Sequence, residues 1–121
     1  MLKWMMAAVA LVAVPAVASA QDADAGKSVF GKCRACHAVG AGAKNMVGPQ
    51  LNGVVGRKAG TVEGFAYSDA MKNSGKTWDD AALDAYLADP KGNIPGNKMV
   101  FVGLKDETDR KNVIAFLKTN K

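Results

Sequence analysis

The two cysteines and the single histidine of this 121-residue chain all lie within five consecutive residues. Cys33 and Cys36 are three positions apart, and His37 follows the second cysteine directly. This C-x-x-C-H spacing is typical of haem attachment, in which both thiols form thioethers with the vinyl groups and the imidazole binds the iron. A single turn of chain can set both sulfurs along one porphyrin edge and the imidazole beneath the iron. The motif therefore predicts one covalent haem c, held by Cys33 and Cys36, with His37 as an axial ligand.

Cysteine pairs at this spacing also occur in dithiol oxidoreductases and in small structural disulfides. A thioredoxin-like centre lies between a strand and a helix of a βαβ unit, whereas here a short helical pattern precedes the motif and a glycine-rich stretch follows it. A structural zinc site needs four ligands, and Cys33, Cys36 and His37 supply only three. We therefore favour haem attachment.

A haem iron bound by one histidine needs a second axial ligand. The soft candidates after residue 20 are Met46, Met71 and Met99. Met46 follows His37 by only nine residues, which is a short chain for reaching the opposite face of the ring. Met71 lies in a short helical pattern, where a methionine usually packs. Met99 lies in a loop with proline and glycine between two expected helices, and we predict that it is the second ligand.

The first twenty residues have the pattern of a secretory signal peptide. Lys3 provides a positive charge, residues 4–17 are apolar apart from one proline, and Ala18-Ser19-Ala20 is a cleavage site of the A-x-A kind. An uncleaved anchor is the alternative, but the uninterrupted apolar run has 11 residues, fewer than the roughly 18–20 that span a bilayer. We expect residues 1–20 to be removed on export to the periplasm and residues 21–121 to form one soluble domain.

This domain has few large apolar side chains for its length. Leu, Ile, Val and Phe account for 20 of its 101 residues, a fraction at which chains begin to lose the ability to fold alone. A haem at the centre would complete such a core. The domain has a charge of +4 with scattered acidic residues, which argues against binding of nucleic acid.

Helices and loops account for the whole domain, and no segment has a convincing strand pattern. We expect Asp24 to cap a first short helix that buries Phe30, and a long glycine-rich loop over residues 40–64. The further elements expected are a short helix over residues 68–73, a helix that starts at residues 77–80 and ends at Pro90, a loop over residues 91–103, and a last helix that starts near Asp106. Long loops in compact domains usually surround something, which is consistent with a haem.

A series of short motifs follows the cysteine motif in order along the domain. They are GP with Leu51 at 48–51, GRKAG at 56–60, GFAYS at 64–68, TW at 77–78, YL at 86–87, DPK at 89–91 and IPGNKMVF at 94–101. In these motifs, from about Gly26 to Leu117, the chain resembles the class I c-type cytochromes, in particular mitochondrial cytochrome c and its short bacterial periplasmic relatives. The resemblance implies an all-α fold of three main helices, with short helices and loops wrapped around one haem.

The resemblance also implies roles for individual residues. The carbonyl of Pro49 would accept the Nδ1 hydrogen of His37, which fixes the orientation of the ring. The other haem-binding positions are Arg57, Tyr67 and Trp78 near an inner propionate, Asn73 and Tyr86 on the methionine side of the iron, and Phe101 at the haem edge. Gly26 would allow the first helix to cross the last one closely.

Ligation by His37 and Met99 would hold the iron six-coordinate in both oxidation states and leave no open position for a substrate. We therefore expect an electron-transfer protein and not an enzyme, shuttling electrons between respiratory or photosynthetic membrane complexes. The expected partners are a cytochrome bc complex as donor and a terminal oxidase or a reaction centre as acceptor. A gas sensor or a peroxidase remains the alternative if Met99 dissociates readily.

The basic ring that surrounds the haem edge in this family is partly kept. The lysines that match it are Lys27, Lys32, Lys91, Lys98 and Lys105, whereas Met46 and Asp106 occupy positions where lysines often occur. Such lysines would steer the protein toward acidic patches on its redox partners. We expect a monomer whose association with these partners is weak, fast and sensitive to salt.

Overall fold

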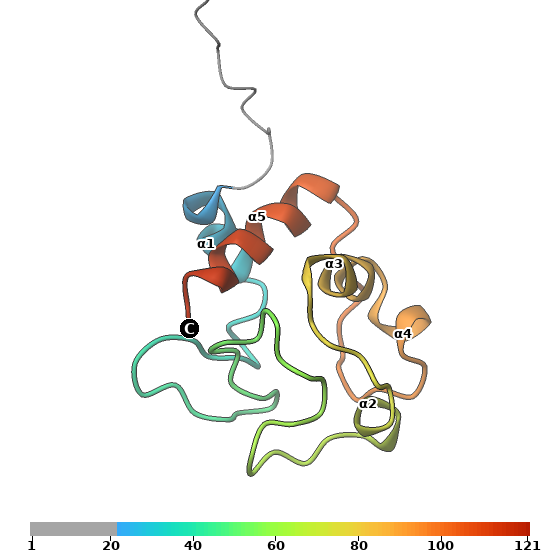
Figure 1. Ribbon diagram of the computed structural model, residues 1–121. Helices are drawn as coiled ribbons and strands as arrows, with labels where there is room; N and C mark the ends of the chain where they lie inside the picture. The colour runs from blue at the N-terminus through green and yellow to red at the C-terminus, as the bar shows by residue number, and fades with distance from the viewer. Residues whose placement is uncertain (1–21) are drawn as a thin grey trace, which may run out of the picture.

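Five helices joined by long loops make up the regular structure of residues 22–121, the part of the chain that the computed structural model describes (Figure 1). They are α1 (Ala23–Phe30), α2 (Asp69–Lys72), α3 (Asp80–Ala88), α4 (Pro90–Asn93) and α5 (Glu107–Lys118). α1 packs against α5, and α3 packs against both α5 and α4. Within these residues extended backbone pairs only at the isolated bridge between Lys58 and Thr77. The predicted all-α fold of three main helices with short helices and loops is confirmed.

The predicted signal peptide at residues 1–20 lies outside the described residues. Within residues 22–121, no helix combines the length and the apolar character that a membrane crossing needs.

Aspartates cap the N-termini of the three main helices. Asp79 caps α3 and Asp106 caps α5 through hydrogen bonds from backbone N–H groups in the first turn. The cap of α1 is Asp22, whose carboxylate accepts from the N–H groups of Asp24 and Ala25. The prediction that Asp24 is the cap was wrong, because Asp22 has the extended backbone of a cap residue and Asp24 already lies in the first turn.

Pro90 has a second role that the sequence pattern did not predict. α3 ends at Ala88, as the proline predicts, but Pro90 is also the first residue of α4. Proline suits the first position of a helix because its φ angle is already helical and no N–H is needed there. The Asp89 side chain accepts from the N–H of Gly92 and caps the turn. The segment expected to be a loop over residues 91–103 therefore starts as a helical turn.

Gly26 lies where α1 crosses α5. A Cβ atom at this position would lie 1.9 Å from the carbonyl oxygen of Asn112, so only glycine permits such a close approach. The side chain of Asn112 also accepts a hydrogen bond from the N–H of Asp22, at 3.0 Å. One turn further along, the rings of Phe30 and Phe116 are 5.3 Å apart. The crossing thus fixes the end of α1, from which the cysteine motif follows.

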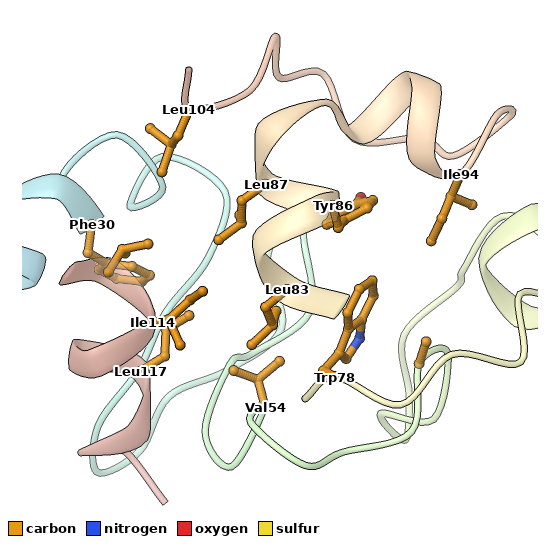
Figure 2. Close-up of a cluster of buried hydrophobic side chains, with 12 residues drawn as sticks. Phe30, Val54, Trp78, Leu83, Tyr86, Leu87, Ile94, Leu104, Ile114 and Leu117 are labelled. Carbon is orange, nitrogen blue, oxygen red and sulfur yellow. The ribbon is translucent and has the colours of Figure 1, made fainter. Parts of the chain in front are cut away.

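The core joins α1, α3 and α5 to side chains from the loops (Figure 2). Leu83, Tyr86 and Leu87 are buried on one face of α3, as their spacing predicts. The ring of Tyr86 lies against the ring of Trp78, with their centroids 5.0 Å apart. Val54 reaches the same cluster from the glycine-rich loop. The long loop is therefore held by buried side chains on the same core as the helices.

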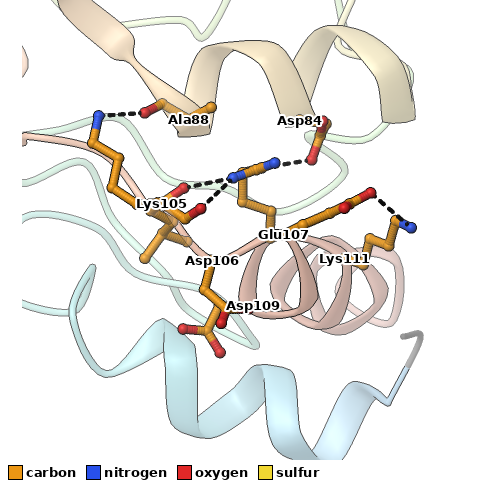
Figure 3. Close-up of polar contacts among 9 residues, drawn as sticks. Asp84, Ala88, Lys105, Asp106, Glu107, Asp109 and Lys111 are labelled. Carbon is orange, nitrogen blue, oxygen red and sulfur yellow. Dashed lines mark hydrogen bonds and ion pairs between the residues drawn. The ribbon is translucent and has the colours of Figure 1, made fainter. Parts of the chain in front are cut away.

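Arg110 anchors the segment that leads into α5, next to the contact between Lys105 and Ala88 that Figure 3 shows. Its guanidinium donates to Asp84 of α3 at 2.8 Å and to the carbonyl groups of Leu104 and Lys105. The Lys105 ammonium in turn donates to the carbonyl of Ala88 at the end of α3, at 2.8 Å. Because the Arg110 side chain is only 13% exposed, the ion pair between Arg110 and Asp84 is better shielded from water than a pair on the surface. The contacts hold the connection before α5 against α3.

Candidate functional site

A cavity of about 450 Å³ lies between α3 and the loops, with a predominantly apolar lining. Cys33, Cys36, His37 and Met99 all line it, although Met99 lies more than sixty residues further along the chain. The other walls come from residues 47–54, residues 65–71, α3 and the end of α5. The fold therefore brings together the two cysteines, the histidine and the methionine that were predicted to hold a haem.

The cysteine motif forms a single turn directly after α1. The backbone N–H groups of Cys36 and His37 both donate to the carbonyl of Cys33, at 3.1 and 2.9 Å. Both cysteines are free thiols and half-buried. Burial raises the pKa of the Cys33 thiol, although the charges of Lys32 and Arg34 act in the opposite direction. A thiol kept protonated is a weak nucleophile, which does not favour a dithiol oxidoreductase.

His37 has its Nδ1 atom 2.7 Å from the carbonyl oxygen of Pro49, the partner that the family resemblance implied. Because a carbonyl oxygen can only accept, Nδ1 carries the hydrogen, and Nε2 of the neutral ring keeps its lone pair. Burial lowers the pKa of His37 and favours this neutral form, which is the one that binds metal. The ring is therefore fixed in the tautomer that an axial ligand requires.

Gly48 provides the space that the His37 ring occupies. A Cβ atom at position 48 would lie 2.3 Å from Cε1 of His37. The backbone of Gly48 is itself held, since its N–H donates to the carbonyl of Cys36 at 2.8 Å and its carbonyl accepts from Met46 at 2.9 Å. The sequence alone predicts no role for Gly48 beyond its place in the GP motif at residues 48–51. Its position just before Pro49, the partner of the histidine, was the available signal.

The sulfur of Met99 accepts a hydrogen bond from the hydroxyl of Tyr86, at 3.4 Å. Tyr86 is 6% exposed, and burial raises its pKa to about 12, so the hydroxyl stays protonated and able to donate. Met71 also lines the cavity, whereas Met46 is 50% exposed and does not line it. Of the three candidate iron ligands, Met71 and Met99 thus lie in the cavity lining. The hydrogen bond from Tyr86 orients the sulfur of Met99.

Four more of the selected residues line the cavity, namely Arg57, Tyr67, Trp78 and Phe101. The guanidinium of Arg57 donates to the carbonyl groups of Gln50 and Asn52. Burial lowers the pKa of Arg57, and no acidic side chain of residues 22–121 pairs with it. A half-buried cation of this kind at an apolar cavity favours a bound group that carries an acidic substituent.

Asn73 does not reach the cavity. It is exposed at the C-terminal end of α2, where its backbone N–H donates to the carbonyls of Asp69 and Met71. Met71, two positions earlier, lines the cavity instead. Residues two positions apart on a helical turn point in nearly opposite directions, so the methionine faces inward and the asparagine outward. The structure therefore does not bring Asn73 to the cavity on the methionine side, as the resemblance implied, and Met71 lies in the lining instead.

All five lysines of the predicted docking ring are exposed, namely Lys27, Lys32, Lys91, Lys98 and Lys105. Lys32 and Lys98 border the cavity together with Val47 and Val100, which are 78% and 96% exposed. The ammonium group of Lys91 donates to the carbonyl of Asn97, and that of Lys105 to the carbonyl of Ala88. Two of the positive charges and two exposed apolar side chains thus border the same cavity.

The residues of the cavity fit a covalently bound haem. The lining is apolar, as the face of a porphyrin requires, and it includes two free thiols and two side chains that bind haem iron. Arg57 adds a cation that lacks an acidic partner within the described residues. Cys33 and Cys36 would hold the haem through thioethers, and His37 with a methionine would bind the iron.

Comparisons with known proteins agree with this site. The family model described as cytochrome c matches residues 23–121. Cytochrome c2 of Rhodomicrobium vannielii is 56% identical over 118 residues, which cover 98% of this chain and 94% of that protein. Cytochrome c2 of Blastochloris viridis is also 56% identical, over 89% of this chain and 85% of its own length. Among solved structures, cytochrome cH from Methylobacterium extorquens is similar with a TM-score of 0.78 and 53% identity, over 82% of this chain and 99% of its own.

Proposed function

The chain belongs to the class I c-type cytochromes and carries one covalently attached haem, and we propose that it transfers single electrons between membrane-bound redox complexes, with His37 and Met99 as the iron ligands. The haem supplies the iron that gains and loses the electron. The observation that carries the proposal is the cavity that brings Cys33, Cys36, His37 and Met99 together. A histidine and a thioether together favour the reduced iron and raise its potential.

The chain's own residues prepare the site for electron transfer without atom transfer. The carbonyl of Pro49 holds the His37 ring, and Tyr86 holds the sulfur of Met99. If both ligands stay bound in both oxidation states, a substrate has no coordination position at the iron. The apolar lining also excludes water, which limits the reorganisation that accompanies a change of charge. These features support an electron carrier and not an enzyme.

The choice of Met99 can be tested on the ferric protein, through the absorption band of the iron–thioether bond. We expect the band in the wild type and in Met46→Ala, whose exposed side chain lies outside the cavity lining. Met99→Ala should retain the covalent haem, lose the band and have a lower potential. Met71→Leu, a change at the other methionine in the cavity, should keep the band. A band that survives in Met99→Ala and disappears in Met71→Leu would assign the ligand to Met71. A wild type without any band would favour the gas sensor or peroxidase.

We also propose that residues 1–20 direct export to the periplasm and are removed there. The mature chain would then start at Gln21 and contain 101 residues. Mass spectrometry of the periplasmic holoprotein tests this proposal, because cleavage after Ala20 and one attached haem together define a single expected mass. If the chain were recovered in the membrane fraction with residues 1–20 still attached, this segment would be an anchor.

The proposed partners are a cytochrome bc complex as donor and a terminal oxidase or a reaction centre as acceptor, docked through the five exposed lysines as a monomer. Lys98 borders the cavity, so Lys98→Gln should slow oxidation by membranes that contain the acceptor and weaken its dependence on salt. Lys111 on α5 is exposed and outside the lining, so Lys111→Gln is the matched control and should change the rate little. Equal effects of the two substitutions would contradict docking at the cavity rim.

A further inference from the structure

The side chain of Asn97 is buried and makes hydrogen bonds with both of its polar atoms. It is 4% exposed. Its Nδ2 atom donates to the carbonyl oxygens of Pro90 and Ile94, both at 2.8 Å, and its Oδ1 atom accepts from the N–H of Met99, also at 2.8 Å. One amide group therefore connects both ends of the turn α4 to the backbone of the cavity methionine.

The backbone around Asn97 strengthens this connection. Its N–H donates to the carbonyl of Ile94, and its own carbonyl accepts from the ammonium of Lys91, at 2.7 Å. Gly96, just before it, has a φ angle of 87°, a left-handed conformation that glycine adopts at little cost. The segment between α4 and Met99 is thus a tight turn, with Asn97 as its central contact.

From these contacts we propose that Asn97 is a positioning residue, which holds the backbone of Met99 so that its sulfur stays at the iron. The inference rests on the proposed function in one respect, that Met99 is the ligand. Both hydrogens of the Asn97 amide are already donated to carbonyl groups, so none is left for a group bound in the cavity. Asn97 lines the cavity as well, but its side-chain hydrogen bonds act on the site through the loop.

The physical reason is the freedom of a methionine side chain, which has three rotatable bonds. With its backbone free to move, Met99 would leave the iron more often, and the fraction of molecules open to another ligand would rise. The apparent affinity of a competing ligand increases in proportion to that open fraction. A buried amide that fixes the N–H of Met99 keeps the open fraction small.

Imidazole binding to the ferric holoprotein measures the open fraction, because imidazole binds where Met99 has left. For Asn97→Ala we expect an apparent affinity about tenfold tighter than for the wild type, which corresponds to ~1.4 kcal/mol. The matched control is Asn112→Ala, which removes another buried asparagine that binds a backbone N–H, at the crossing of α1 and α5. This control should lower the stability of the fold but change imidazole affinity less than twofold.

Equal imidazole affinities for Asn97→Ala and the wild type, with a normal iron–thioether band in both, would overturn the positioning role and leave the proposed function intact. Equal increases in Asn97→Ala and Asn112→Ala would also overturn it, since general destabilisation would then be the cause. A wild type without the band would instead refute the proposed ligation.

Amide hydrogen exchange in the wild-type holoprotein gives a second test that needs no variant to fold. We expect the N–H of Met99 to be protected by the carbonyl of the Asn97 side chain. Exchange at the rate of an exposed amide would overturn the inference.

Discussion

Gly48→Ala perturbs the histidine side of the site by a single methyl group. The φ angle of Gly48 is not in the left-handed region, so alanine suits the backbone there. The methyl group, however, would lie 2.3 Å from Cε1 of the His37 ring and 2.7 Å from Nδ1 and Nε2. Contacts of 3.4 Å or more are ordinary, so the ring or the backbone has to move by about 1.1 Å, the difference between 3.4 and 2.3 Å.

Either movement breaks a hydrogen bond. A shift of the ring stretches the 2.7 Å bond from His37 to Pro49, and a shift of the backbone strains the bonds of Gly48 to Cys36 and Met46. A lost hydrogen bond costs about 1 kcal/mol, and overpacking costs about 1–3 kcal/mol more. Replacing glycine restricts the unfolded chain, which returns about 0.4–1 kcal/mol. We therefore expect Gly48→Ala to lower the free energy of unfolding by about 2 kcal/mol.

Urea unfolding of the ferric holoprotein, followed by circular dichroism, measures this loss. The matched control is Gly31→Ala at the end of α1, where φ is −50° and the nearest atom to a new Cβ is the carbonyl oxygen of Ser28 at 3.0 Å. This contact needs only a few tenths of an ångström of adjustment, so the change should stay within about 1 kcal/mol. If Gly48→Ala were as stable as the wild type, the reasoning about contact between Gly48 and the His37 ring would be refuted.

Gly26→Ala should destabilise the holoprotein by about 2 kcal/mol or more in the same assay, because the clash with the Asn112 carbonyl outweighs the helix propensity of alanine; a stability equal to or above that of the wild type would contradict the close crossing. Tyr86→Phe removes the hydrogen bond to the Met99 sulfur, which then donates more electron density to the iron. The midpoint potential should fall by about 20–60 mV, the equivalent of one hydrogen bond of about 0.5–1.5 kcal/mol, and an unchanged potential would argue against Met99 as the ligand. Because the pKa of Tyr86 is raised from 10.0 to about 12 on folding, its contribution to stability is complete below pH 10 and lost as the pH rises through 12. The fall in stability over this range should therefore be smaller in Tyr86→Phe, and equal slopes for the two proteins would contradict the raised pKa.

Local patterns in the sequence were sufficient for much of the fold. Leu83, Tyr86 and Leu87 have helical spacing and are buried on one face of α3, and the last helix begins next to Asp106, as expected. The prediction was wrong where two nearby residues of the same type could take the same role, as Asp22 and Asp24 could at the cap of α1. A cap is decided by which of two aspartates first adopts extended backbone, and the residue types alone do not show this.

In the candidate site too, features with a local sequence signal were predictable, and features that depend on the folded chain were not. The cysteine motif could be identified from its spacing because it is contained in one turn, and Met99 could be selected by its place in the chain. Whether Met71 or Asn73 points into the cavity depends on how the four-residue helix α2 is rotated about its axis. Such a helix is too short for its hydrophobic periodicity to predict this. The role of Asn97 depends on carbonyl groups of Pro90 and Ile94, which lie close only because the turn α4 forms. Such contacts are visible only in the folded chain.

The size of the cavity explains why covalent attachment and folding belong together in this protein. Without the haem, the apolar side chains that line a cavity of about 450 Å³ would face water instead of a packed core. A small domain is stable by only about 5–15 kcal/mol, so the loss of this buried apolar surface is a large fraction of its stability. Replacing both Cys33 and Cys36 by alanine removes the attachment and should therefore leave a chain without cooperative unfolding in urea. Recovery of a stable, cooperatively folded apoprotein from this double variant would show that residues 22–121 fold without the haem. The loss of structure that we expect would mean that the thioethers secure part of the hydrophobic core as well as the redox centre.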